Sequence, residues 1–199
     1  MKTHLLAAAL ALAPALALAE TSSFKIDSAH TQTTFAVRHL VISTVRGEFS
    51  KVEGSAVIDD ADLTKSSVQA SIDVASVNTR EPKRDTHLKS ADFFDAEKFP
   101  KITFKSTKVE KAGEGTLKVT GDLTIRGVTK SVVLDVTGPT KEIKDGWGMT
   151  RRGLSATTKV NRKDFGVSWN SMIEAGPVVG DEITILIEAE LIKDQPAKK

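Results

Sequence analysis

One stretch of the sequence, residues 115–136, limits what this chain can fold into more than any other. Its apolar residues at alternate positions are Leu117, Val119, Leu123 and Ile125 in the first half and Val132, Leu134 and Val136 in the second. Because successive side chains of a β-strand point to opposite faces, this pattern indicates two strands, each with one apolar face. Gly127 separates the two halves, so we predict an antiparallel hairpin whose apolar face encloses a core or a cavity.

The same alternation recurs along the chain in a total of about eight or nine strands. The expected extended runs outside the hairpin cover residues 24–26, 31–40, 45–59, 68–74, 101–104, 149–160 and 182–192. We interpret 45–59 as one run that bends at Gly47 and Gly54. The last run is apolar on both faces at residues 183–187, which predicts that it is covered on both sides or packs against the loop before it.

Residues 78–100 interrupt this pattern. Residues 84–89 have helical composition, and Ser90 can begin a second short helix that carries Phe93 and Phe94. We therefore expect one or two short helices over an open end of the sheet. Farther on, residues 161–166 are typical of a single capped turn, with Asn161 at its start and Gly166 at its end.

Many short strands with short connections argue for an antiparallel sandwich or barrel, and a barrel leaves no exposed edge. About eight strands enclose an interior just wide enough for packed side chains or one slender ligand. Several of the positions placed inside are small, which favours a cavity over a solid core: Thr33, Ala56, Ala70, Gly121 and Ala156.

Composition excludes several classes of function. The 199 residues suit one domain, and 28 Lys and Arg against 26 Asp and Glu give a net charge of +2, too little for a nucleic-acid-binding field. There is no Cys, hence no disulfide, thiolate metal site or cysteine nucleophile. Three histidines lie beyond the N-terminal segment, and their spacing fits no zinc pattern, so we expect no metal site.

The N-terminus has the features of a cleaved signal peptide. Lys2 precedes an Ala/Leu-rich run that ends in the small-x-small motif of residues 17–19. The run is shorter than the roughly 20 residues that span a bilayer. We therefore expect a signal peptide over residues 1–19, cleaved after Ala19, and an exported domain over residues 20–199 without stable membrane insertion.

Several ordered blocks resemble the YceI-like family of exported polyisoprenoid-binding proteins. The blocks are Asp27–Thr31, Phe35–Leu40, Gly47–Phe49, Arg84–Asp95, Phe99–Ser106, Gly121–Lys130 and Asn161–Gly166. The resemblance implies an all-β fold, a lipocalin-like antiparallel eight-stranded β-barrel with one or two short helices near its open end. It further implies a periplasmic, non-catalytic protein without cofactor. Such a protein holds an isoprenoid quinone or polyprenyl phosphate for transport, storage or protection during envelope stress.

Under this hypothesis a set of apolar residues lines the bore and binds the chain of the ligand. They are Phe35, Val37, Phe49, Ile72, Phe94, Phe104, Leu123, Ile125, Leu134 and Ile185. The alternative is that these side chains form a closed, solid core. A row of small apolar residues and the resemblance together favour the cavity.

Polar residues near the mouth are candidates for binding the head group: His30, His39, Arg84, Asp85, His87 and Arg162. Each also has a structural alternative. His39 can be satisfied by backbone hydrogen bonds, and Arg84 and Asp85 can pair to fix a helix on the barrel. Arg126, beside the Gly127 turn, is interpreted as a solvated hairpin charge.

Two other functions remain open from the sequence. One is an enzyme that acts on a lipid or quinone through residues 84–87, although no nucleophile motif accompanies them. The other is a solid-core barrel whose loops bind a protein partner. The sequence also leaves the oligomeric state open, a homodimer included.

Overall fold

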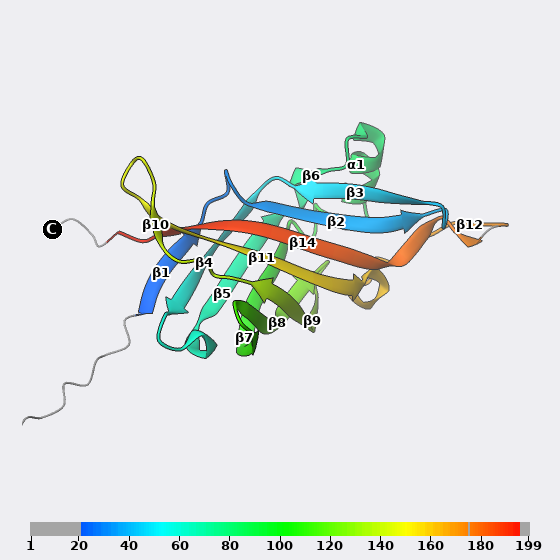
Figure 1. Cartoon of the computed structure of the whole chain (residues 1–199). Coiled ribbons are helices and arrows are strands. Elements are labelled where there is room, and N and C mark those ends of the chain that lie inside the picture. The colour runs from blue at the N-terminus through cyan, green and yellow to red at the C-terminus, as the bar shows by residue number, and fades with distance from the viewer. Residues whose placement is uncertain (1–20, 175, 196–199) are drawn as a thin grey trace, which may run out of the picture.

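The computed structural model describes residues 21–174 and 176–195, which form a long antiparallel barrel (Figure 1). The main sheet of the described chain contains β1 (Thr21–Ile26), β2 (Gln32–His39), β3 (Ser43–Phe49), β4 (Val52–Asp59), β5 (Ser67–Asp73), β6 (Val77–Asn78), β7 (Lys101–Gly113), β8 (Thr116–Ile125), β9 (Val128–Thr137), β10 (Ile143–Lys144), β11 (Thr150–Asn161) and β14 (Val179–Lys193). A small ribbon pairs β12 (Met172–Ile173) with β13 (Gly176–Pro177). The helical segments are α1 (Pro82–Lys89) and the 3-10 turns η1 (Leu63–Lys65), η2 (Val74–Ser76) and η3 (Arg162–Phe165).

Eight strands close the barrel. Their order is β11-β9-β8-β7-β5-β4-β1-β14, and the ring closes because β14 also pairs with β11, from Arg151↔Ile192 to Asn161↔Glu182. Residues 179–188 of β14 also pair with β2, and β3 and β6 follow on that side. The predicted all-β, eight-stranded antiparallel barrel is confirmed.

The two ends of the barrel differ. At the helix end, α1 and the segment after it lie near the β8–β9 turn, and β2 and β3 run past the barrel towards β12 (Figure 1). We call the opposite end of the barrel the β10 end. It contains β10, the start of β1 and the last residues of β14. In the part of the chain that the structure describes, no helix is both long and apolar enough to span a bilayer.

The hairpin predicted over residues 115–136 is present as β8 and β9. Ile125 pairs with Val128, so Arg126 and Gly127 alone make the turn, with φ of 48° and 73°. Two successive positive φ angles define the tight turn that matches the twist of paired strands, and glycine adopts such a φ without strain.

The expected run over residues 45–59 is divided at Ser50 and Lys51, where a bend separates β3 from β4, and the two strands keep the same direction. The two glycines lie inside strands instead of at bends. A side chain at Gly47 would collide with the Phe35 ring, and one at Gly54 with the backbone of β5. The buried residues are odd-numbered in β3, as at Gly47 and Phe49, and the buried apolar residues are even-numbered in β4, as at Val52 and Ala56, so the phase of the alternation changes at this bend.

The described residues contain one α-helix, and the second helix expected from Ser90 is absent. Ser90 instead ends α1, since its backbone N–H and its hydroxyl both donate to the carbonyl of His87. Residues 91–99 then form successive turns, with Asp95 at a φ of 52° that an α-helix cannot contain. The segment nevertheless lies at an end of the barrel, as expected, because Phe93 is buried in the core at the helix end.

Two further expectations can be compared directly with the structure. The capped turn over residues 161–166 is confirmed: Asn161 accepts a hydrogen bond from the Lys163 N–H, and Gly166 ends the turn at a φ of 73°. Of the two arrangements expected for β14, coverage on both sides is wrong. Leu186 on its outer face is 46% exposed, while Ile185 and Ile187 line the interior.

Candidate functional site

A cavity of about 280 Å³ lies inside the barrel, close to the lower limit of typical ligand pockets. At the helix end it reaches Leu88, Phe93 and Phe94, and towards the β10 end it reaches Leu63 and Leu191. It therefore extends along the barrel instead of occupying one pocket in its wall. An elongated apolar space of this kind is suited to a slender hydrocarbon chain.

The structure places every residue that we predicted to contact the ligand chain on the wall of this cavity. They are Phe35, Val37, Phe49, Ile72, Phe94, Phe104, Leu123, Ile125, Leu134 and Ile185. Their contact with a ligand stays a prediction. Four of the five small residues expected to leave space also line it: Thr33, Ala56, Ala70 and Ala156. The fifth, Gly121, does not, because the Phe104 ring occupies the place of its side chain.

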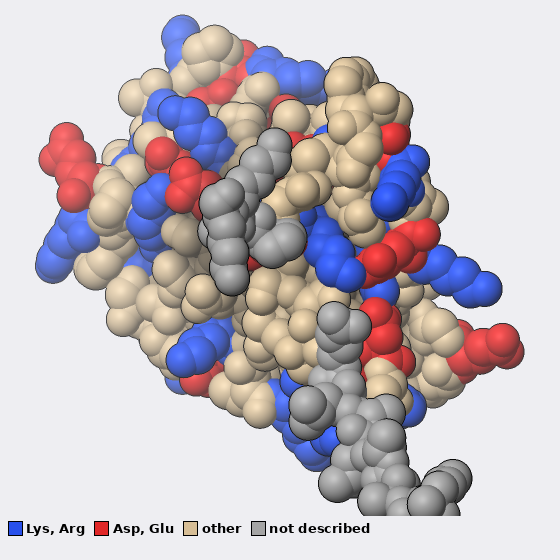
Figure 2. Space-filling view, turned by 90° about the vertical axis from the view of Figure 1, so that its left-hand side faces the viewer, with Lys and Arg blue, Asp and Glu red and all other residues tan. Residues whose placement is uncertain are grey.

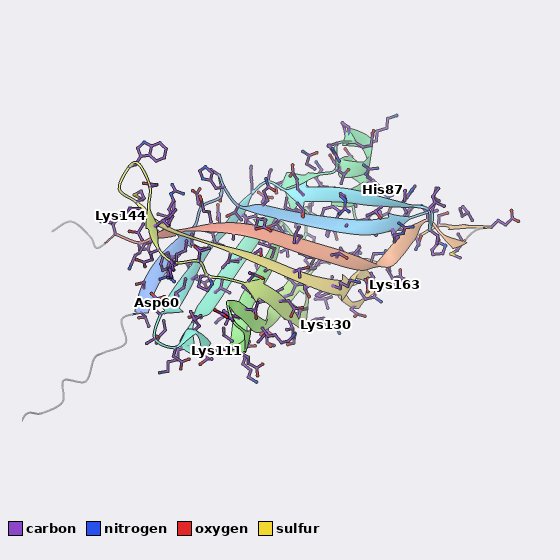
Figure 3. The ribbon with its side chains drawn as sticks, in the orientation of Figure 1. Asp60, His87, Lys111, Lys130, Lys144 and Lys163 are labelled. Carbon is purple, nitrogen blue, oxygen red and sulfur yellow. The ribbon has the colours of Figure 1, made fainter. Side chains whose placement is uncertain are left out.

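Aromatic rings close the helix end of the cavity. The Phe49 ring lies 5.6 Å from Phe35 and 5.8 Å from Phe94, measured between ring centroids. Next to them the His87 ring meets Phe93 and Trp169 edge-on at 4.9 Å and 5.0 Å. His87 lies at this end (Figure 3). Its Nε2 atom is 2.8 Å from the Asp92 carboxylate.

Arg126 connects three segments at this end of the barrel. It is therefore not the solvated hairpin charge that the sequence suggests. Its guanidinium donates to the carbonyl of Gly166 at 2.7 Å and to that of Ala91 at 2.8 Å. It thereby joins the β8–β9 turn to η3 and to the segment that follows α1. A turn position alone could not show this, since both acceptors lie at least 35 residues away in the sequence.

Arg84 and Asp85 do not pair with each other but both bind Thr79, which is buried. The Thr79 N–H and hydroxyl donate to the Asp85 carboxylate at 2.8 Å and 2.6 Å. Arg84 donates to the Thr79 hydroxyl and carbonyl at 2.8 Å and 2.9 Å. These contacts anchor α1 on the residue that follows β6. Neither residue is among those that line the cavity.

Arg162 is the single ionisable side chain among the described residues that line the cavity, and it is 5% exposed. Its five N–H groups reach acceptors within the protein: the carbonyls of Gly180, Val167, Trp169 and Val179 and the Asp181 carboxylate. Burial lowers the pKa of Arg162, against the opposing effect of Asp181. This arrangement leaves no donor of Arg162 directed to a ligand.

The other two candidate head-group residues lie elsewhere. His39 ends β2, where it pairs with Val179 and Ser43. His30 lies at the β10 end, with its Nδ1 atom 2.8 Å from Asp27 and 3.4 Å from Glu190. The six polar candidates are thus distributed over separate places and do not form one site.

The residues around His30 form a charged cluster that sequence reasoning missed. One nitrogen of Arg151 lies 2.6 Å from Asp27 and 2.9 Å from Glu190, and another lies 2.6 Å from Asp145. Hydrogen bonds from His30 and Arg151 lower the pKa of Asp27 to about 2. The ligand atoms of Asp27, His30 and Glu190 are within 4.8 Å of one another, as a metal would require. The Arg151 guanidinium, however, already provides the positive charge there.

A second, more open hollow of about 350 Å³ lies at the β10 end and shares Leu63 and Pro139 with the main cavity. Arg152 lines this hollow and is 7% exposed. It pairs with Asp60 at 2.6 Å, and its buried Nε has no hydrogen-bond partner among the described residues. The consecutive Arg151 and Arg152 at the start of a strand were the signal that could have directed attention to this end. Figure 2 shows basic and acidic side chains interspersed over it, without a field of one sign.

Comparison with known proteins identifies the family. The model of the YceI-like domain matches residues 24–191, nearly the whole described chain. The chain belongs to the YceI-like domain family. A UPF0312 protein of Vibrio cholerae is 39% identical over 170 residues, which make up 84% of this chain and 89% of that protein.

Solved structures agree with the YceI-like fold. Burkholderia cenocepacia BcnA superposes with a TM-score of 0.72 at 25% identity, over 83% of this chain and 98% of that one. A polyisoprenoid binding domain from Saccharophagus degradans superposes with a TM-score of 0.63 over 87% of this chain and 99% of that one. At 15% identity, the second likeness concerns the fold alone.

Proposed function

We propose that this protein is an exported, non-catalytic carrier that holds one long isoprenoid chain in its barrel. The observation that carries the proposal is the elongated apolar cavity, whose one ionisable lining residue, Arg162, has its donors engaged within the protein. A cavity without free polar groups cannot compensate the desolvation of a polar substrate, whereas a hydrocarbon chain needs no such compensation.

Burial of the hydrocarbon chain contributes more to the binding free energy of the ligand than its head group does. Burying ~20 carbons at about 0.8 kcal/mol per CH₂ gives a gross transfer free energy near 16 kcal/mol. Ordering the flexible chain offsets much of that gain. A head group that adds one charge-assisted hydrogen bond contributes roughly 1.5–3 kcal/mol. The hollow beside Arg152 offers such a group a polar place next to the bore.

The Saccharophagus degradans structure, described as a polyisoprenoid binding domain, supports the same class of ligand for this chain. The proposed cellular location rests on the sequence alone, because the proposed signal peptide over residues 1–19 lies outside the described residues. A cleaved signal peptide would direct the protein to the periplasm, where transport, storage or protection of an envelope quinone or polyprenyl phosphate would be its task.

The competing proposal, an enzyme that uses residues 84–87, is less well supported. Arg84 and Asp85 are engaged on Thr79, and His87 is held by Asp92 and meets two aromatic rings edge-on. Such contacts fix a helix, and general acid–base catalysis needs a group within reach of a substrate. We therefore propose that α1 is a structural closure of the barrel.

Solvent extraction of the purified protein, followed by mass spectrometry, tests the carrier. We expect one long-chain lipid per protein molecule, unchanged after prolonged incubation. An empty extract combined with failure to take up added isoprenoid would contradict the proposal and favour a solid barrel that binds a protein partner. Chemical conversion of the lipid would favour the enzyme.

Fluorescence gives an independent measurement, because the two tryptophans lie in different places. Trp169 packs on Phe93 at 5.2 Å, beside the cavity, whereas Trp147 is 87% exposed in the loop after β10. In a Trp147→Phe variant, emission from Trp169 should shift on addition of isoprenoid. The matched Trp169→Phe variant, which keeps Trp147, should show no shift.

A further inference from the structure

Four of the large apolar side chains that are exposed in the described chain gather at one tip of the molecule. Val41 is 57% exposed, Ile42 78%, Met172 72% and Ile173 44%. We call these four residues the apolar tip. They come from two segments far apart in sequence, the β2–β3 turn and the β12–β13 ribbon, which lie together beyond the helix end (Figure 1).

The two segments are held together by backbone contacts. The Leu40 N–H donates to the Val178 carbonyl at 2.9 Å, and the Val178 N–H donates to the Ser171 carbonyl at 2.9 Å. A side chain placed on Gly176 would lie 3.9 Å from Val41. The apolar tip is therefore one convex surface and not two unrelated loops.

The β2–β3 turn has a backbone conformation that large apolar residues do not favour. Leu40 and Val41 have φ of 52° and 62°, a conformation that glycine and asparagine adopt readily and a β-branched residue rarely does. A strained valine exposed to water costs stability both through its backbone and through its surface. Strain of this kind is typical of functional positions.

The apolar tip continues the wall of the cavity. Val37 and Val179 line the cavity, and Val179 pairs with His39, the residue before the turn. A surface docked on this tip would thus lie close to the end of the bore. That end carries the aromatic closure formed by Phe93, Phe94 and their neighbours.

Basic side chains lie directly behind the apolar tip. Arg38 is exposed and donates to the Val41 carbonyl at 2.7 Å and the Thr44 hydroxyl at 3.1 Å, both uncharged. Arg46 is exposed on the neighbouring strand. Neither arginine forms an ion pair within the described residues. The acidic residue at the tip, Glu174, belongs to the other segment, the β12–β13 ribbon. Apolar side chains in front of uncompensated arginines match the layering of a bilayer surface, with hydrocarbon beneath phosphate.

We infer that the apolar tip docks this protein on a lipid bilayer that contains anionic phospholipid, with Val41, Ile42, Met172 and Ile173 inserted at the interface. The inference rests on the proposed function, because a carrier of a membrane lipid must collect and deliver its cargo at a bilayer. A protruding convex tip suits insertion between lipids, whereas a protein partner would need a matching pocket.

Flotation with vesicles tests the inference. Purified full-length protein is mixed with vesicles of phosphatidylethanolamine and phosphatidylglycerol, and the bound fraction is measured for wild type and for an Ile42→Ser/Met172→Ser variant. We expect the double variant to bind at least about tenfold more weakly, since each side chain loses its burial in the interface. Its lipid content and far-UV circular dichroism should match wild type, because both side chains are exposed.

The matched control removes two exposed apolar side chains from the other end. Ile143 and Trp147 are 61% and 87% exposed near β10, and an Ile143→Ser/Trp147→Ser variant should bind vesicles as wild type does. Arg46→Gln should weaken binding about fivefold on vesicles with phosphatidylglycerol and not on phosphatidylcholine alone.

Several results would overturn the inference. Equal binding by the tip variant and wild type, or a loss confined to the Ile143/Trp147 variant, would show that the tip does not dock. A wild-type dimer that the tip variant converts to a monomer, without vesicle binding, would assign the tip to a second copy. A wild type that carries lipid but does not float overturns the docking alone, whereas a protein that takes up no lipid overturns the proposed function.

Discussion

The ring of Phe35 on β2 occupies the space where Gly47, its paired residue on β3, lacks a side chain. The glycine lets the ring approach the neighbouring strand closely, and the ring packs against Phe49 at 5.6 Å with an interplanar angle of 45°. The width of the cavity near the helix end is therefore set by a residue that does not itself line it.

This relationship predicts that Gly47→Ala displaces the ring and destabilises the fold. A methyl group at this position has no room, so we expect the free energy of unfolding to fall by about 1–3 kcal/mol in urea denaturation. Gly146→Ala is the control, because a side chain at Gly146 would meet no atom within 4 Å. Equal effects of the two substitutions would mean that the Phe35 ring moves aside without strain.

A cavity-filling substitution distinguishes a hollow barrel from a solid one. Ala156 lies on the inner face of β11 and lines the cavity. Ala156→Leu should lower the affinity for an isoprenoid by about tenfold or more, since it displaces ligand carbons, while leaving the unliganded protein as stable as wild type. A solid core would instead lose about 1–3 kcal/mol of stability through overpacking. Val133→Leu, on the outer face of β9 at 43% exposure, is the control.

The contacts of Thr79 predict strong coupling with Asp85. Thr79→Val removes the hydroxyl that Asp85 accepts from and leaves a carboxylate with fewer partners. In a double-mutant cycle with Asp85→Asn, measured by urea denaturation, we expect a coupling free energy of about 0.5–3 kcal/mol. Additive effects would indicate that the two side chains do not anchor α1 together.

The cluster at the β10 end predicts a particular dependence of stability on pH. Hydrogen bonds from His30 and Arg151 lower the pKa of Asp27 from 3.8 to about 2. A lowered pKa in the folded state means that the carboxylate stabilises the fold above pH 3.8 and that this contribution disappears as the pH falls towards 2. Asp27→Asn should therefore cost about 1 kcal/mol at neutral pH, a size typical of a partly exposed ion pair.

Below pH 2 the variant and wild type should unfold with the same free energy, because Asp27 is then protonated in both states. Asp122→Asn removes the same charge from an exposed position on β8 and serves as control. A difference between Asp27→Asn and wild type that stays constant from neutral pH to pH 2 would contradict the assignment.

Local patterns in the sequence predicted much of the barrel. Alternation with a period of two located its strands, Gly127 located the hairpin turn, and Asn161 with Gly166 bounded a capped turn. The same alternation placed Leu123, Ile125 and the other expected lining residues on the wall of the cavity. These features follow from the chemistry of neighbouring residues, so the sequence contains them directly.

Tertiary structure alone decided the roles of the polar residues. Arg126, Arg162 and Arg84 each find acceptors that no local pattern specifies, and the partners of Arg126 lie 35 and 40 residues away. Apolar burial needs only the correct face of a strand, because the hydrophobic effect has no direction. A hydrogen bond needs one donor and one acceptor at a fixed distance and angle, and only the closed barrel brings those atoms together.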